Sequence, residues 1–207
     1  MDKISQLAEL EKEIRAAKLP LSESNLVFGE GNPDCQVLFI GEAPGFHEDK
    51  LGRPFVGRAG KLLDELIIMV GWKREDVYIT NIVKRRPPEN RDPLPTEIEA
   101  YKPYLARQIE VIKPKIIATL GRFSMNYFLP FAKISLDRGK VFQTDGYTIF
   151  PLYHPAAALR STNVLEELRK DFRKLPDVVS GKIAPEEELP QIILPKRKEK
   201  TPQIKLF

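Results

Sequence analysis

Four short, largely apolar runs separated by longer amphipathic segments are the feature that most restricts how this chain can fold. They lie at residues 36–41, 77–83, 115–121 and 147–153. Runs this short and this apolar are typical of strands that are buried on both faces of a parallel sheet. Strands that alternate with helices favour a layered sandwich, so the sequence predicts an α/β protein with a mainly parallel sheet.

Apolar residues spaced three and four apart predict the helices between these runs. Thr96 is expected to cap one helix, with Glu99 closing a capping box. A hairpin is expected across Asp145-Gly146, a strong turn pair that separates residues 141–144 from the last strand. The expected helices cover residues 3–18, 59–70, 96–112, 122–129 and 163–173.

The composition restricts the class of protein. Of the 207 residues, 42% are hydrophobic and 30% are charged, which is typical of a soluble globular chain. No window of about 18 uncharged apolar residues occurs, so no membrane span is expected, and the charged N-terminus lacks the apolar region of a secretory signal. The single cysteine, Cys35, excludes an internal disulfide framework and a cysteine-rich metal site. We therefore expect a cytoplasmic protein.

The chain divides into two regions by composition. Residues 1–180 carry the alternating pattern and are expected to form one folded domain. From residue 181 onward prolines and charged residues predominate, so residues 181–207 are expected to be a flexible tail. The tail ends in Gln203-Ile204-Lys205-Leu206-Phe207, whose apolar side chains are unusual at a solvated terminus.

Polar side chains stand at the ends of three predicted strands. The first strand runs into Gly41-Glu42-Ala43-Pro44-Gly45, the second carries Asn81, and the last is followed by His154. Ligands of an open parallel sheet bind beyond the carboxyl ends of its strands. A carboxylate, an amide and an imidazole that meet there can hydrogen-bond to a polar heterocycle and can donate or accept protons. The alternatives are a plain turn at Glu42, a loop cap at Asn81 and a structural histidine at His154.

A series of motifs between about residues 10 and 175 resembles the family 4 uracil-DNA glycosylases. The motifs are EGNP at 30–33, FIGEAPG at 39–45, GRPFVGRAG at 52–60, YITNIVK at 78–84, RPPENR at 86–91, PKIIATLGR at 114–122 and HPAAAL at 154–159. The resemblance implies a three-layer α/β/α sandwich around a central four-stranded, mainly parallel sheet. It also implies DNA repair by base flipping, in which the N-glycosidic bond of uracil in DNA is hydrolysed and an abasic site remains.

One departure from this family concerns its cofactor. Members of the family typically hold a 4Fe–4S cluster through four cysteines, and a cluster needs thiolate ligands. This chain has Ala17, Arg85 and Tyr101 at three of those positions, lacks a residue at the remaining one, and has Cys35 outside all of them. We therefore predict no cluster and no other metal. Arg85, Tyr101 and apolar residues near Ile14 are expected to hold the N-terminal helix to the proline-rich loop instead.

The resemblance also implies roles in binding the base. Phe55 is expected to stack on uracil and to crowd the methyl group of thymine, the alternative being a plain core residue. The Asn81 amide is complementary to the O4 and N3–H edge of uracil, and cytosine presents the opposite order of donor and acceptor. Backbone amides of Gly41, Glu42 and Ala43 are expected to add donors.

Two residues are expected to carry the chemistry. Cleavage leaves negative charge on the departing uracil and a cationic sugar, and His154 is expected to donate a hydrogen bond to O2 of the base. Glu42 is expected to orient the water and to stabilise the sugar. Whether Glu42 acts as a base or as an electrostatic partner stays open.

Basic residues near these positions are expected to contact DNA. Lys84, Arg85, Arg86 and Arg91 form a cluster that would neutralise phosphates, the alternative being a solvated loop. The loop at 156–160 matches the family's loop that probes the duplex. Its side chains Leu159, the expected wedge, and Arg160 are assigned to DNA, the alternative for Leu159 being inward packing.

The end of the chain predicts a partner. Gln203, Ile204, Leu206 and Phe207 resemble the short peptide by which bacterial repair proteins bind the DNA polymerase sliding clamp. No sequence signal for an oligomer was found, so a monomer is expected. Two rival functions remain: a glycosylase for other deaminated bases, and a catalytically silent DNA-binding module of the same fold.

Overall fold

The computed structural model describes residues 1–144, 146–185 and 187–188. Its centre is a set of parallel strands in the order β3 (Tyr78–Asn81), β2 (Val37–Gly41), β4 (Ile116–Leu120) and β6 (Tyr147–Leu152). These are the strands that the apolar runs predicted, so the expected four-stranded parallel core is confirmed. The clamp-like residues Gln203, Ile204, Leu206 and Phe207, and Asp145 of the hairpin turn, lie outside the described residues.

Three short strands widen this core into a seven-stranded sheet. β1 (Glu30–Gly31) pairs antiparallel with β3, and β5 (Phe142–Thr144) pairs antiparallel with β6. β7 (Glu187–Glu188) pairs parallel with β5, so the segment expected as a tail contributes backbone to the edge of the sheet. Strands of two or three residues are too short to carry a periodic pattern, which explains why β1 and β7 were not expected.

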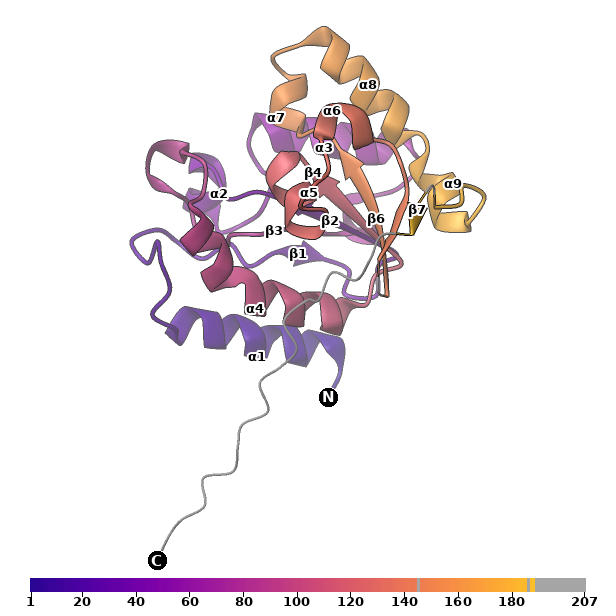
Figure 1. Ribbon diagram of the computed structural model, residues 1–207. Helices are drawn as coiled ribbons and strands as arrows, with labels where there is room; N and C mark the ends of the chain where they lie inside the picture. The colour runs from indigo at the N-terminus through magenta and orange to yellow at the C-terminus, as the bar shows by residue number, and fades with distance from the viewer. Residues whose placement is uncertain (145, 186, 189–207) are drawn as a thin grey trace, which may run out of the picture.

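Helices cover both faces of the sheet (Figure 1). Side chains alternate along β2, because Leu38 and Ile40 belong to one buried cluster, and Val37 and Phe39 to the other. The three-layer sandwich is thus confirmed. The first cluster packs against α1 (Lys3–Ala16), α4 (Pro95–Ile112) and α5 (Arg122–Phe128); the second against α3 (Arg58–Met69), α7 (Pro155–Ala158), α8 (Thr162–Phe172) and α9 (Leu175–Ser180).

The remaining elements are short and lie in the connections. They are α2 (Phe46–Leu51), α6 (Ile134–Asp137) and the 3₁₀ turns η1 (Arg74–Asp76) and η2 (Pro88–Asn90). No helix among the described residues is long and apolar enough to cross a membrane.

The start of α4 differs from the expectation. Leu94 is the N-cap and Pro95 the first helical residue, so the prediction of Thr96 as N-cap is wrong. Proline suits the first helical position because it has no N–H to leave unpaired. Glu97, not Glu99, reaches back and accepts a hydrogen bond of 2.8 Å from the backbone N–H of Leu94.

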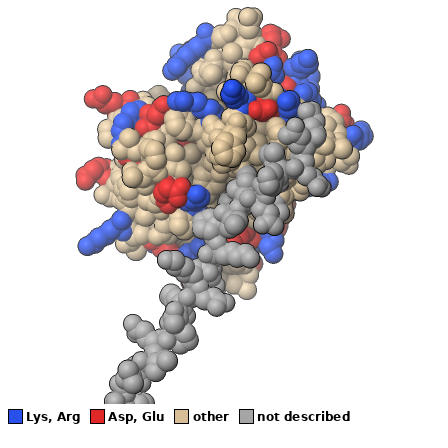
Figure 2. Space-filling view, viewed as in Figure 1, with Lys and Arg blue, Asp and Glu red and all other residues tan. Residues whose placement is uncertain are grey.

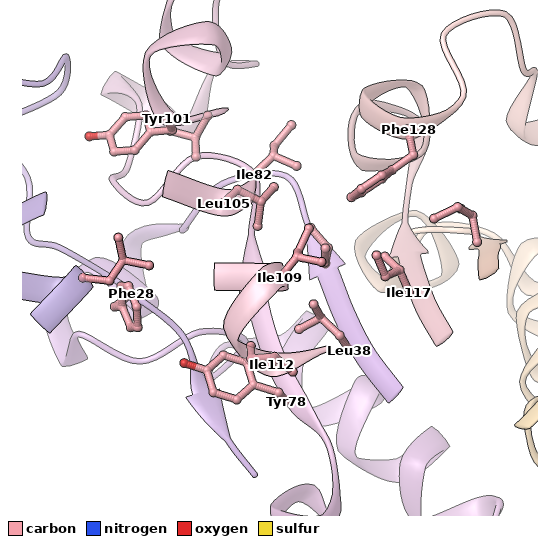
Figure 3. Packing of buried hydrophobic residues seen from close by; sticks show 14 of the residues in the cluster. Phe28, Leu38, Tyr78, Ile82, Tyr101, Leu105, Ile109, Ile112, Ile117 and Phe128 are labelled. Carbon is pink, nitrogen blue, oxygen red and sulfur yellow. The ribbon is translucent and has the colours of Figure 1, made fainter. Parts of the chain in front are cut away.

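Packing of α4 on the sheet fixes the strands that carry the site. Leu105, Ile109 and Ile112 of this helix belong to the same cluster as strand residues Leu38 and Ile117, and all five are fully buried; Figure 3 shows Ile109 and Ile112 near Leu38. Burial of each such side chain stabilises the fold by about 1.5–3 kcal/mol relative to exposure. The middle strands β2 and β4 are therefore held on this face by a well-packed helix.

Candidate active site

A cleft opens at the carboxyl ends of the parallel strands. Gly41 ends β2 and is paired in register with Asn81, which ends β3, while His154 follows β6. The cleft has a volume of about 340 Å³, in the range of small-ligand pockets. It brings together the carboxylate, amide and imidazole that were expected to meet. Its lining includes Glu42, Ala43, Glu48, Phe55, Asn81, Asn90, Arg91, His154 and Arg160.

The His154 imidazole is held as a neutral hydrogen-bond donor. Its Nδ1 accepts a hydrogen bond of 3.0 Å from the backbone N–H of Ala156, at the start of α7. A nitrogen that accepts carries no proton, so the ring proton lies on Nε2. Burial lowers the pKa of His154 to about 4. At neutral pH the side chain therefore offers one uncharged N–H donor in the cleft that it lines.

Glu42 carries a carboxyl group that titrates near neutral pH. Its pKa is raised to about 7, mainly because burial disfavours the charged form and also because the Asp92 carboxylate repels it. The Arg122 guanidinium acts in the opposite direction. Asp92 and Arg122 form an exposed ion pair of 2.8 Å with each other. The charge balance of this pair therefore influences how much of Glu42 is ionised.

Asn81 presents a buried amide whose oxygen has no hydrogen-bond partner in the described part of the chain. The residue is 2% exposed, and its Oδ1 accepts no hydrogen bond from any described residue. Gly41 packs against this oxygen, since a Cβ atom on Gly41 would lie 2.4 Å from it. An unpaired buried acceptor is costly, so a donor group on a bound ligand would stabilise the site.

Phe55 forms an apolar wall of the cleft. Its ring centroid lies 5.7 Å from that of His154, with 31° between the ring planes. A Cβ atom on Gly41 would lie 2.6 Å from Cζ of Phe55, so the missing side chain makes room for the ring. Gly41 itself does not line the cleft, whereas Ala43 does.

Glu48 of α2 is a site residue that the sequence did not single out. Its Oε1 accepts hydrogen bonds from the backbone N–H groups of Val56 (2.9 Å) and Gly57 (2.8 Å). It thereby fixes the far end of the loop that carries Phe55. An acidic residue in the first turn of a short helix is too common to have indicated this contact.

The comparisons with known proteins agree with this geometry. Residues 28–175 match the family model described as the Uracil DNA glycosylase superfamily. The chain belongs to the uracil-DNA glycosylase superfamily.

Several curated relatives are similar along most of their length. A type-4 uracil-DNA glycosylase from Saccharolobus solfataricus is 47% identical over 88% of this chain and 89% of its own length. One from Sulfurisphaera tokodaii is 46% identical over 86% of each chain. A third, from Archaeoglobus fulgidus, is 44% identical over 81% of this chain and 89% of its own. The resemblance to family 4 is thus confirmed.

Lys84 is not part of a DNA-binding surface of this glycosylase, and that prediction is wrong. The residue is fully buried. Its Nζ donates hydrogen bonds to Thr80 Oγ1 (2.6 Å), the Asn81 carbonyl (2.9 Å) and Gln108 Oε1 (2.6 Å). Burial lowers its pKa well below the usual value. Lys84 instead fixes the backbone of Asn81 from beneath the cleft.

Arg85 is likewise directed inward. Its guanidinium donates to the carbonyl of Ser24, and its Nε is buried without a partner among the described residues. A side chain in this position is poorly placed for a phosphate contact. Arg86 lies further out: its Nε donates to Asn90 Oδ1 at 2.7 Å, and its guanidinium lies 5.2 Å from the centroid of the Phe46 ring.

The other expected DNA contacts lie at the rim of the cleft. Arg91 and Arg160 both line the cleft, and Arg91 also pairs with Glu97 at 2.6 Å. Leu159 is 42% exposed at the end of α7, so it does not pack inward. Figure 2 shows cationic and acidic side chains interspersed over the face in view, so on that face the positive charge is not gathered into one patch.

The positions of the family's cluster cysteines do not fit an iron–sulfur cluster in this chain. Tyr101 is buried, and its hydroxyl donates a hydrogen bond of 2.7 Å to the carbonyl of Pro20. With Arg85 donating to Ser24, both side chains tie α4 and the proline-rich loop to the segment that follows α1. Neither offers a thiolate, and the described residues contain no group of three or more histidine, cysteine, aspartate or glutamate side chains suited to a metal.

Proposed function

We propose that this protein excises uracil from DNA by hydrolysing the N-glycosidic bond, which leaves an abasic site. The observation that carries the proposal is that one cleft holds an unpaired amide at Asn81, a neutral donor at His154 and a carboxyl group at Glu42, beside the Phe55 ring. Membership of the superfamily supports the same conclusion. Because the reacting bond lies inside the stack, the base must first be flipped into the cleft.

Recognition of the base rests on Phe55 and Asn81. The flat face of uracil stacks on the Phe55 ring. The Asn81 amide donates to O4 of the base, and its oxygen accepts the N3 proton. Cytosine would place its N3 acceptor against the Asn81 oxygen and its N4 donor against the Asn81 NH₂ group, so these buried groups would stay unpaired and cytosine is excluded. The Gly41 backbone beneath both side chains keeps them in place.

The bond breaks between C1′ of the sugar and N1 of uracil, and the bonding electron pair leaves with the base. The Nε2–H of His154 donates to O2, where the negative charge develops. Ionised Glu42 faces the cationic sugar and orients the water whose oxygen bonds to C1′. One proton of that water is transferred to solvent or to the departing base, so the products are free uracil and an abasic sugar.

The DNA strand is expected to lie across the rim of the cleft. Arg91, Arg160 and Arg86 are the cations that face outward there, and we assign phosphate contacts to them. Leu159, half exposed on the loop after His154, fills the space that the flipped base vacates.

Three further properties belong to the proposal. The protein contains no 4Fe–4S cluster, since Arg85 and Tyr101 stand in place of thiolate ligands. It acts as a monomer in the cytoplasm. Its C-terminal Gln203, Ile204, Leu206 and Phe207 bind the DNA polymerase sliding clamp, which is supported by sequence alone. Deletion of residues 203–207 is expected to abolish clamp binding and to leave cleavage of free oligonucleotides unchanged; unchanged clamp affinity would reject this part.

A panel of oligonucleotides tests the main proposal. Single- and double-stranded substrates carry uracil, hypoxanthine, xanthine or thymine at one position, and alkali then cuts any abasic site. We expect strand cleavage at uracil by the wild type and a large loss in Glu42→Gln. Cleavage only at the purines would favour a glycosylase for other deaminated bases, and binding of the DNA without any cleavage would favour a silent module. Iron analysis of the same preparation is expected to show no stoichiometric iron.

A further inference from the structure

Arg74 lies in η1 and uses every donor of its guanidinium. Its Nε and Nη2 donate to Glu30 Oε1 at 2.9 and 2.8 Å, and its Nη1 donates to Asp64 Oδ1 at 2.6 Å. The two remaining N–H groups reach the loop that carries Phe55: Nη2 donates to the Pro54 carbonyl at 2.6 Å and Nη1 to the Phe55 carbonyl at 3.3 Å. Five donors thus meet five acceptor contacts in the planar fork that only arginine provides.

The carbonyls that Arg74 holds belong to a strained stretch of backbone. Phe55 has φ +51°, the left-handed region that side chains other than glycine rarely adopt. The first turn of α3 closes on it from the other side, since a Cβ atom on Gly60 would lie 1.9 Å from the Phe55 carbonyl oxygen. A conformation of this kind persists only where the surroundings impose it.

We propose that Arg74 is a positioning residue that holds Phe55 in the orientation needed to stack on the flipped base. The inference rests on the proposed function. Two carboxylates, Glu30 of β1 and Asp64 of α3, fix the guanidinium. The guanidinium in turn fixes the carbonyls of Pro54 and Phe55, so the aromatic wall keeps its place whether or not a base is bound.

The structure provides a matched control in Arg53. This residue pairs with the same Glu30 carboxylate, at 2.7 Å, and is adjacent to the same loop in sequence. Its guanidinium donates only to that carboxylate among the described residues, and its side chain is 60% exposed. Loss of Arg53 therefore removes a surface ion pair with Glu30 but none of the contacts to the loop carbonyls.

The test compares Arg74→Gln, Arg74→Lys and Arg53→Gln in single-turnover cleavage of a uracil-containing oligonucleotide, together with inhibition by free uracil and the melting temperature. A lysine keeps the positive charge but lacks the planar guanidinium, so it cannot bind both carboxylates and also donate to the carbonyls of Pro54 and Phe55. We expect both Arg74 variants to cleave about 10- to 100-fold more slowly and to bind free uracil more weakly, because the Phe55 ring is misplaced. Arg53→Gln is expected to stay within about twofold of the wild type, because it loses only a surface ion pair. All assays are run well below each variant's melting temperature, and Arg74→Lys decides the test if Arg74→Gln does not fold.

A double-mutant cycle separates positioning from general support of the fold. If Arg74 acts through Phe55, then Arg74→Gln in a Phe55→Ala background slows cleavage by no more than about twofold beyond Phe55→Ala alone. Fully multiplicative effects, or Arg74 variants that cleave and bind uracil like Arg53→Gln, would overturn the inference. A wild type that leaves uracil untouched would instead reject the proposed function itself.

Discussion

The most specific prediction concerns the pH dependence of cleavage. If ionised Glu42 is required and its pKa is about 7, the single-turnover rate falls about tenfold for each pH unit below about 7 and reaches a plateau above about pH 8. The sign follows from the raised pKa: the neutral carboxyl predominates on the acid side and the active carboxylate on the alkaline side. His154, with a pKa of about 4, remains neutral throughout and contributes nothing to this limb.

Two substitutions in the neighbouring ion pair sharpen this prediction. Asp92→Asn removes the charge that raises the pKa of Glu42, so the acid limb moves to lower pH. Arg122→Gln removes the charge that lowers it, so the limb moves to higher pH. The assay uses excess enzyme over a uracil-containing oligonucleotide at constant ionic strength, followed by alkaline cleavage. A flat profile between about pH 5 and 8, or a shift of both variants in the same direction, would show that ionisation of Glu42 does not control the rate.

Three other outcomes are expected. Lys84→Met removes three hydrogen bonds to buried acceptors and lowers the free energy of unfolding by about 2–4 kcal/mol in denaturant titrations. The dependence of DNA affinity on salt stays that of the wild type, and a shallower salt slope would restore Lys84 as a phosphate contact. Tyr101→Phe removes the bond to Pro20 and costs about 1 kcal/mol of unfolding free energy with cleavage unchanged, and an unaltered stability would contradict this. His154→Ala lowers the single-turnover rate by about 100- to 1,000-fold, and a rate near wild type would remove it from the mechanism.

The parallel core and the meeting of Glu42, Asn81 and His154 could be predicted because both follow from one pattern. Buried apolar runs place strands side by side, and the carboxyl ends of parallel strands meet at one edge of the sheet. The residues at those ends therefore lie close together in the structure, although the tautomer of His154 and the pKa of Glu42 could not be predicted from the residues alone. Those depend on burial and on the N–H of Ala156.

The position of Lys84 could not be predicted from its neighbours. A lysine followed by two arginines is typical of a solvated or DNA-binding surface, yet here the Lys84 side chain is fully buried, although the residue lies beyond the end of β3 at Asn81. The acceptor that makes this burial possible, Gln108, comes from α4 and is distant in sequence.

The contacts that hold the Phe55 loop were missed for the same reason. Glu48 and Arg74 each form hydrogen bonds with backbone groups of that loop, and such hydrogen bonds do not change the pattern of hydrophobic residues from which helices and strands are predicted. The left-handed backbone of Phe55 gives no signal either, because glycine is the residue that marks such positions.

A crystal structure of the protein with an abasic-site oligonucleotide and free uracil would show directly whether Phe55, Asn81 and His154 hold the base as proposed. We expect uracil stacked on Phe55, its O4 and N3 facing the Asn81 amide, and its O2 within hydrogen-bond distance of Nε2 of His154. Uracil bound with its N3–H and O4 turned away from Asn81, or bound outside this cleft, would contradict this expectation.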